Sequence, residues 1–183
     1  MILECIVTTM DGAGRVNIAP MGVIPEGDTV TLKPYRETAT YRNLKVTPSA
    51  VVHLVDDAGI FARSALSDYH AETVPAERVR GAVLTAACSW MELEVVRIDD
   101  SRERAVIPCS VVHRGRFREF LGYNRARNAI LEATILATRT RFLPPEQIWS
   151  DLDRLNVIVG KTGDAPERAS MDFIMAFVRE ALG

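Results

Sequence analysis

The stretch Asp11-Gly-Ala-Gly-Arg-Val-Asn-Ile-Ala-Pro-Met21 decides the start of the fold. Its two glycines form a tight turn between two strand-like segments rich in β-branched residues, Ile2–Thr9 and Val16–Ile24. A second set of turn formers, Pro25–Asp28, leads into the strand-like segment Thr29–Leu32. We therefore predict that the chain opens with an antiparallel β-meander.

The chain then alternates between helical and strand-like segments. Glu37–Lys45 is compatible with a short helix that ends before Pro48. Residues 67–82 have no clear pattern. Further strands are predicted at Ala50–Val55, Ile60–Leu66, Ser89–Ile98 and Ala105–Arg114.

After about residue 121 the sequence pattern favours helices. One helix is predicted over Asn124–Arg141, a second begins at Pro145, and a third follows Asp164, a possible cap. Gly160 is expected to end the second helix. Strands followed by helices predict an α+β fold, with a mostly antiparallel β-barrel or sheet and a helical tail.

Composition excludes several classes of protein. The 183 residues are 48% hydrophobic and 25% charged, as in an ordinary globular protein, and a net charge of -2 gives no basic field to attract nucleic acid. No apolar run is long enough for a membrane span, and the first residues lack the features of a secretory signal, so a cytoplasmic location is expected. The three cysteines lie far apart in apolar runs and are predicted to be buried thiols.

Familiar catalytic motifs are incomplete. Val159–Thr162 ends like a phosphate-binding loop but lacks its first glycine, and Gly12–Gly14 lacks the third glycine of a dinucleotide fingerprint. The histidines His53, His70 and His113 do not have the spacing of zinc ligands, so no metal site is predicted.

Two linked segments carry the strongest functional signal. The strand containing Asn17, Ala19 and Pro20 is followed by Thr38-Ala-Thr-Tyr-Arg-Asn-Leu44 and then by the β-branched strand Ala50–Val55. Together they resemble the flavin reductase-like group of FMN-binding split barrels, over roughly the first 55 residues. The split barrel with a helical tail also looks like an uncharacterised prokaryotic family of such proteins, for which a flavin site is implied but a reaction is not.

The residues also have a physical interpretation. Proline removes a backbone donor, so Pro20 predicts a strand edge or break where peptide groups are free to meet a planar polar ring. Thr38 and Thr40 near a helix N-terminus, with Arg36 close by, form a plausible phosphate cradle. The alternative for Thr38 is a plain helix cap, and the alternative for Pro20 is protection of an edge strand.

The resemblance distributes these residues around the cofactor. It implies that Asn17, Ala19 and Pro20 lie near the flavin ring and ribityl chain, and that Thr40 and Asn43 lie on the phosphate side. Arg36 and Thr38 are not implied by the resemblance; we add them to the phosphate side because one is positively charged and the other carries a hydroxyl near the helix N-terminus.

Two further residues are candidates for contact with the ring. His53 lies where the family commonly has asparagine and is a candidate to face the flavin, or else a satisfied core histidine. Tyr123 is a candidate to stack on the ring, and Arg125 or Arg127 is a candidate to meet an anion. The alternative is that all three residues belong to an ordinary exposed surface. No catalytic acid or base is evident, and His53 and Tyr123 are only candidates for these roles.

The resemblance implies a six-stranded antiparallel split barrel over residues 1–120 and a helical subdomain over 121–183, packed on the barrel. It also implies a homodimer with FMN bound between subunits. The functional hypothesis is an FMN-binding flavoprotein, and within it an FMN-dependent oxidoreductase that takes hydride from NAD(P)H or a small-molecule substrate. The alternatives are a non-catalytic flavin-binding or dimeric interaction protein, and a barrel that binds a deazaflavin or pterin-like ring.

Overall fold

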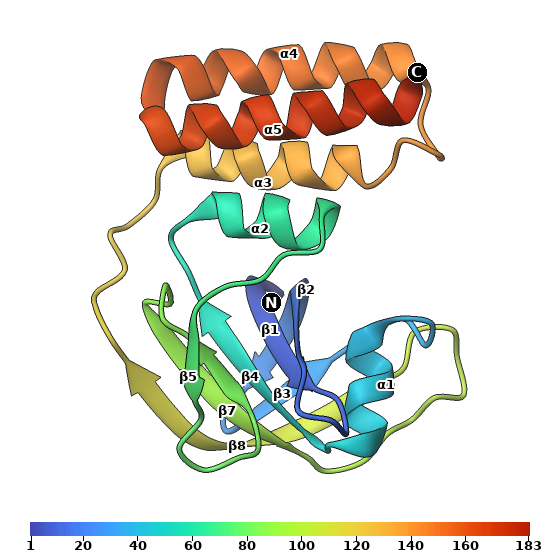
Figure 1. Ribbon diagram of the computed structural model, residues 1–183, viewed down its shortest axis with the longest axis vertical. Coiled ribbons are helices and arrows are strands. Elements are labelled where there is room, and N and C mark those ends of the chain that lie inside the picture. Colours follow the sequence, from blue (N-terminus) through green and yellow to red (C-terminus); the bar gives the residue numbers. More distant parts are fainter. The chain divides into compact units, whose positions relative to one another are not determined.

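The computed structural model describes residues 1–183, and six of its strands close an antiparallel barrel. Around the barrel the order is β1-β2-β3-β8-β7-β4 (Figure 1). The strands are β1 (Leu3–Met10), β2 (Val16–Glu26), β3 (Thr29–Leu32), β4 (Ser49–Leu54), β7 (Ser89–Val95) and β8 (Ile107–Arg116). With the C-terminal helices described below, this confirms the predicted α+β fold and its six-stranded barrel.

The β1–β2–β3 meander forms as its turns predict. The Asp11 Oδ1 atom accepts hydrogen bonds from the backbone N–H groups of Ala13 and Arg15, both at 2.9 Å, and Gly14 has a φ of +86°. Gly27, with a φ of +63°, makes the turn into β3. Because side chains other than glycine rarely adopt these angles, the glycines set the register of the meander.

Alternate strand residues fill the barrel interior, and α1 (Ala39–Val46) adds Tyr41 and Leu44 to the same core. The core includes Cys5, Val7, Val23, Val30, Leu32, Ala50, Val52, Met91, Leu93, Ile107 and Cys109. All three cysteines are buried free thiols, as predicted, and burial raises the pKa of Cys5 and Cys109 to about 12.

Most of strand β2 has one unpaired edge. Val16–Val23 pairs with β1, whereas β3 pairs only with Ile24–Glu26. Alternate peptide groups of Val16–Val23 therefore point away from β1 without a neighbouring strand. Pro20 lies within this segment, so the strand edge predicted from its position is confirmed.

A small two-stranded sheet covers part of the barrel's outer face, in the region that had no clear sequence pattern. It consists of β5 (Thr73–Pro75) and β6 (Ala82–Leu84). The Glu92 carboxylate accepts hydrogen bonds from the backbone N–H groups of Glu77–Val79 and from Trp90 Nε1, which fixes the loop between these strands. Only glycine fits at position 115, because a Cβ there would lie 2.1 Å from the Trp90 ring.

Four helices form the second unit of the chain, which combines Asp56–Tyr69 with Leu121–Gly183. The helices α2, α4 and α5 all pack on α3, around a core that includes Ala62, Ile130 and Ile174 (Figure 1). Their bounds are α2 (Ala58–Leu66), α3 (Arg125–Ala137), α4 (Pro145–Thr162) and α5 (Ala165–Leu182). The first unit is Met1–Val55 with His70–Phe120. The domain boundary after residue 120 stays a prediction.

Two local expectations were wrong. Ile60–Leu66 was expected to be a strand and is part of α2, because Asp57 caps the helix by accepting from the Gly59 N–H at 2.8 Å. Its short apolar run has no decisive period, and Ala58 and Ala62 both enter the helical core. Gly160 lies inside α4, which ends instead at Gly163, whose N–H donates to the carbonyl of Val159.

Candidate functional site

Three of the predicted site residues meet where α1 packs against β1 and β2. The Asn17 Nδ2 atom donates to Thr40 Oγ1 at 3.2 Å, and Asn43 Nδ2 donates to Thr9 Oγ1 at 3.1 Å. Thr9 and Asn17 are direct cross-strand partners, so the two hydrogen bonds lie side by side. Thr9 is the member of this cluster that sequence reasoning missed.

The two other predicted residues of β2 lie on opposite faces of the strand. Ala19 pairs with Val7 and shares the inner face with Asn17, whereas Pro20 pairs with Ile6 on the outer face. Both belong to the segment with the unpaired edge, and both are partly exposed. Contact with a ligand at this edge would therefore come from backbone groups as much as from side chains.

Thr38 caps helix α1. Its Oγ1 atom accepts from the Tyr41 N–H at 3.3 Å and donates to the carbonyl of Tyr35 at 2.7 Å. A helix leaves its first N–H groups without intrahelical acceptors, and this cap satisfies only that of Tyr41. The N–H groups of Ala39 and Thr40 remain at the positive end of the helix dipole.

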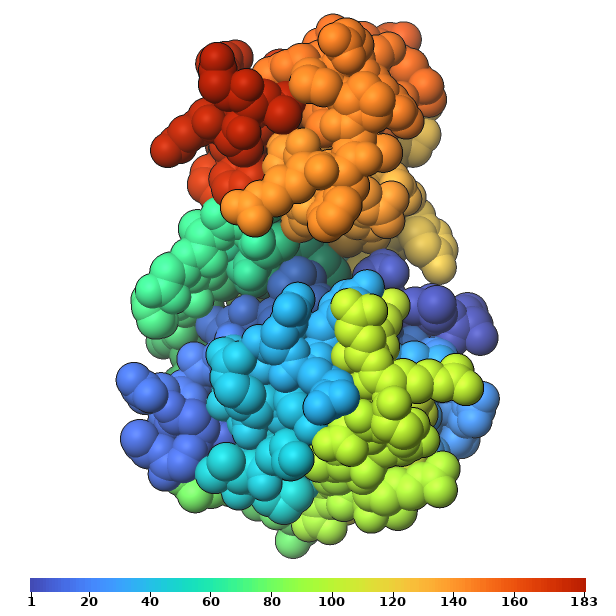
Figure 2. Space-filling model, turned by 90° about the vertical axis from the view of Figure 1, so that its right-hand side faces the viewer, coloured from blue at the N-terminus to red at the C-terminus, as the bar shows by residue number.

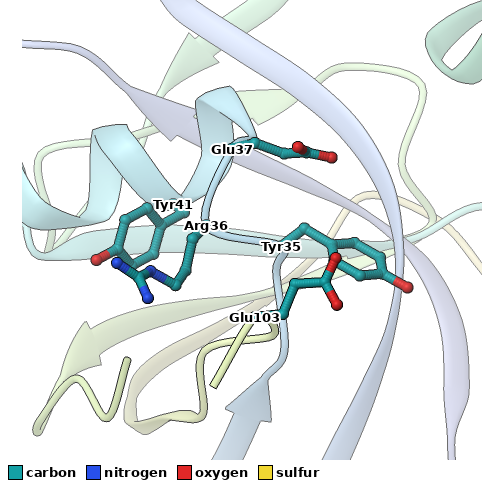
Figure 3. Close-up of a pocket in the computed structure, with 5 residues that line it drawn as sticks. All are labelled: Tyr35, Arg36, Glu37, Tyr41 and Glu103. Carbon is teal, nitrogen blue, oxygen red and sulfur yellow. The ribbon is translucent and has the colours of Figure 1, made fainter. Parts of the chain in front are cut away.

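Arg36 lies just before this cap and lines a pocket of about 550 Å³. The pocket is lined by Tyr35, Arg36, Glu37, Tyr41 and Glu103 (Figure 3). Arg36 and Tyr41 lie on one side of it, and Tyr35 and Glu103 on the other. The Arg36 backbone N–H donates to the Glu103 carbonyl, and the Arg36 guanidinium makes no hydrogen bond or salt bridge. Its charge does act on a carboxylate, because the pKa of Asp100 is lowered by the Tyr41 hydrogen bond and, to a smaller extent, by Lys45 and Arg36. The Arg36 guanidinium extends towards the Tyr41 side chain (Figure 3). A guanidinium without a salt-bridge partner, on the segment that leads into a helix N-terminus, is suited to an anion.

The wall of this pocket includes Glu103, which belongs to the loop Asp99–Arg104. The Tyr41 hydroxyl donates to Asp100 Oδ2 at 2.5 Å, and Lys45 Nζ lies 3.5 Å from the same oxygen. Figure 2 shows the surfaces of α1, in cyan, and of this loop, in yellow-green, side by side on one face of the barrel unit. No sequence signal links Tyr41 to a partner 59 residues away.

His53 is fully buried and both its ring nitrogens are engaged. Nε2 accepts from the Leu84 N–H at 3.1 Å, so the neutral ring carries its proton on Nδ1, which donates to the Ile6 carbonyl at 3.1 Å. Burial lowers the pKa of His53 to about 4, against a smaller opposing effect of the Ile6 hydrogen bond. His53 therefore has no ring nitrogen available to a ligand.

Tyr123 belongs to the helical unit, not to the barrel unit that holds the other candidates, and is 96% exposed. The adjacent Asn124 caps α3 by accepting from the N–H groups of Ala126 and Arg127. The Arg127 guanidinium does meet anions, but they are carboxylates of the chain: Glu167 at 3.2 Å and Asp56 at 3.9 Å.

The chain has no group of three or more His, Cys, Asp or Glu side chains placed to hold a metal ion. None of its helices is both long and apolar enough to span a membrane.

Comparison with protein families shows which family the chain belongs to. Residues 3–118 match the "Protein of unknown function (DUF447) N-terminal domain", and residues 124–176 match a second domain of that description. The chain belongs to the DUF447 family. Its matched regions cover both the barrel strands and the C-terminal helices.

A solved structure of a DUF447 protein matches nearly the whole chain. This FMN-bound protein from Methanosarcina mazei is 25% identical, with a TM-score of 0.83 over 96% of this chain and 94% of its own. The resemblance to FMN-binding split barrels drawn from the sequence is thereby confirmed.

More distant structures match about two thirds of the chain and show the fold alone. The 2-nitrobenzoate 2-nitroreductase of Pseudomonas fluorescens is 20% identical, with a TM-score of 0.54 over 62% of this chain and 64% of its own. Component B of the nitrilotriacetate monooxygenase of Bacillus cereus is 18% identical, with a TM-score of 0.54 over 66% and 71%.

Proposed function

We propose that this DUF447 protein is a flavoprotein that binds FMN at the junction of β2 and α1. The observation that carries the proposal is the likeness, over nearly the whole chain, to a family member with bound FMN. The site residues also have the chemistry that FMN requires, since FMN combines a planar polar ring with one phosphate group.

The phosphate fits the start of α1. The free guanidinium of Arg36 and the N–H groups of Ala39 and Thr40 supply charge-assisted hydrogen bonds to an anion. Thr38 contributes indirectly, because its hydroxyl is used in capping the helix. Thr40 and Asn43 lie one and two turns into the same helix and would line the approach to the phosphate.

The ring fits the unpaired edge of β2. Peptide groups of Val16–Val23 that have no strand partner supply donors and acceptors in the plane of a flavin ring. Asn17 and Ala19 share one face of this segment, and Pro20 marks its open edge. His53 is not part of the proposed set, because its ring nitrogens are already bonded.

Within this function we propose an FMN-dependent oxidoreductase. When bound, FMN accepts a hydride and passes electrons to an acceptor, while the protein holds and orients the ring. The proposal draws support from the nitroreductase and monooxygenase component that share the barrel fold. We assign no general acid or base, so in this proposal the chain's task is to bind and orient the ring. NAD(P)H as donor and a homodimer whose partner completes the site are parts of the same proposal.

The first experiment is a visible absorption spectrum of the purified protein, before and after incubation with FMN and gel filtration. A retained flavin band at about one per chain supports the proposal, and a colourless protein that does not retain FMN contradicts it. A deazaflavin and a pterin are included as competitors, because displacement of FMN by either at lower concentration would change the assigned ligand.

Turnover then separates an enzyme from a binding protein. The FMN-loaded protein is mixed with NADH or NADPH without oxygen, and flavin absorbance is followed before and after oxygen is admitted. Bleaching and recovery faster than for free FMN support an oxidoreductase. An unchanged spectrum with every donor and acceptor tried would favour a non-catalytic flavin-binding protein.

A further inference from the structure

We infer that the hydrogen bond between Tyr41 and Asp100 is a positioning contact for Arg36, through which the loop Asp99–Arg104 sets the preference of the site for a phosphorylated flavin. The inference rests on the proposed function, because it concerns the phosphate side of the same site. Tyr41 and Asp100 act through Arg36 and are not themselves ligands of the phosphate.

The first step is the backbone connection between this loop and the segment that carries Arg36. The Arg36 N–H donates to the Glu103 carbonyl at 3.1 Å, and the Ala105 N–H donates to the Pro34 carbonyl at 3.0 Å. Between these two bonds, Tyr35 and Arg104 form an antiparallel bridge. The backbone of Arg36 is thus held by the loop and by no regular strand.

The side chain of Arg104 reinforces this connection. Its Nε atom donates to the Lys33 carbonyl at 3.2 Å, and its guanidinium lies over the Tyr35 ring, 4.8 Å from the centroid. The position of Arg36 therefore depends on the position of the whole loop.

The contact with α1 is made by Asp100. The Tyr41 hydroxyl donates to Asp100 Oδ2, and Lys45, one turn along the helix, faces the same carboxylate. The neighbouring residue Asp99 shapes the loop by accepting from the Ser101 N–H and hydroxyl. Because the Tyr41 ring is buried in the barrel core, its hydroxyl is a fixed anchor for an otherwise exposed loop.

The loop therefore joins the two parts of the phosphate cradle. On one side it holds the backbone of Arg36, and on the other it is held to α1, whose first N–H groups face the phosphate. Placing a flexible arginine requires a supported backbone, because a long side chain loses entropy when it is ordered on a ligand. Without the Tyr41–Asp100 hydrogen bond, the loop and Arg36 would be free to shift relative to the helix.

The test is the substitution Tyr41→Phe, which removes the hydroxyl and keeps the ring in the core. We expect the Kd of FMN to rise about tenfold while the Kd of riboflavin, which has no phosphate, changes by less than about twofold. Both constants are measured by quenching of flavin fluorescence. Tyr69→Phe, which removes a tyrosine hydroxyl in the helical unit, is the matched control and should change neither constant.

Two further variants distinguish positioning from a general structural role. On an Arg36→Ala background, Tyr41→Phe should change FMN affinity by less than about twofold, because its effect passes through Arg36. Asp100→Asn retains an acceptor for the Tyr41 hydroxyl and should keep most of the preference for FMN, whereas Asp100→Ala should lose it.

Equal losses for FMN and riboflavin, or a full tenfold loss of FMN affinity on the Arg36→Ala background, would overturn the positioning role and leave the proposed function standing. Failure of the unchanged protein to bind either flavin would overturn the proposed function and this inference with it.

Discussion

The N-termini of α1 and α3 share a polar cap and a nearby arginine but differ in their electrostatic surroundings. Each begins after a polar cap, Thr38 or Asn124, and each has an arginine within three residues of the cap. At α3, the guanidinium of Arg127 meets two carboxylates of the same unit, that of Asp56, just before α2, and that of Glu167 in α5. At α1, the guanidinium of Arg36 lines a pocket and makes no salt bridge, although its charge contributes to the lowered pKa of Asp100.

The difference separates an arginine that completes a fold from one that is available to a ligand. Arg127 compensates Asp56 and Glu167, which are nearly buried, so its charge is already used within the helical unit. The charge of Arg36 is not used in this way, and the neighbouring N–H groups of α1 add to it. Substitution should therefore affect ligand binding at one helix and stability at the other.

The largest effect is expected for FMN binding by the double variant Arg36→Ala with Thr40→Ala. Loss of charge-assisted hydrogen bonds to the phosphate should raise the Kd of FMN about 100-fold or more, and that of riboflavin less than about threefold. Isothermal titration calorimetry with both ligands measures the ratio. Arg141→Ala, which removes an exposed arginine of the helical unit, controls for the general effect of removing a positive charge. Similar losses for both ligands would remove the phosphate assignment.

The second prediction concerns the other helix. Arg127→Met should lower the free energy of unfolding by about 2 kcal/mol, because it leaves the carboxylates of Asp56 and Glu167 without their counter-ion. Urea denaturation followed by far-ultraviolet circular dichroism measures the loss. FMN affinity should stay unchanged. A variant with normal stability and weakened FMN binding would contradict the contrast between the two arginines.

The comparison also shows why the fold was more accessible from the sequence than the site. Three of the barrel's strand pairings, β1–β2, β2–β3 and β7–β8, join barrel strands that follow one another along the chain. The turns of the first two pairings carry glycine and aspartate, which favour tight turns. The exception in secondary structure is α2, whose short apolar run is compatible with a strand or a helix until its partner helices are known.

The site depends on contacts that have no local signal. Asn17, Thr40 and Asn43 were brought to attention by a resemblance, and the structure does bring them together. Tyr41 and Asp100, by contrast, carry no motif, and the two arginines cannot be told apart until their carboxylate partners are in place. His53 shows the same limit, because its two hydrogen-bond partners are backbone groups of β1 and β6.

The third prediction concerns Glu167, the partner of Arg127, and the dependence of stability on pH. Burial raises the pKa of Glu167, but hydrogen bonds from the Asp164 N–H and from Arg127 outweigh it, so the pKa lies below its usual value of 4.5. Its contribution to stability is therefore present above pH 4.5 and is lost as the pH falls through the lower folded pKa. Between neutral and acidic pH, the free energy of unfolding of the Glu167→Gln variant should fall by about 1 kcal/mol less than that of the unchanged protein. Urea denaturation at a series of pH values measures this, and parallel curves for the two proteins would contradict it.

The smallest expected effect is at Arg125, the first residue of α3. Its exposed positive charge faces the positive end of the helix dipole, so Arg125→Gln should raise the free energy of unfolding by about 0.3 kcal/mol. Arg179→Gln is the matched control, because Arg179 is also exposed but lies in the last turn of α5, where a positive charge is favourable and its removal should cost a similar amount. Both changes are measured by urea denaturation at low salt and should shrink at high salt. If Arg125→Gln instead destabilises the protein, the unfavourable interaction with the helix dipole is not the dominant one. The side chain of Arg125 would then make a favourable interaction in the folded protein, as Arg127 does, and both arginines of α3 would differ from Arg36 in this respect.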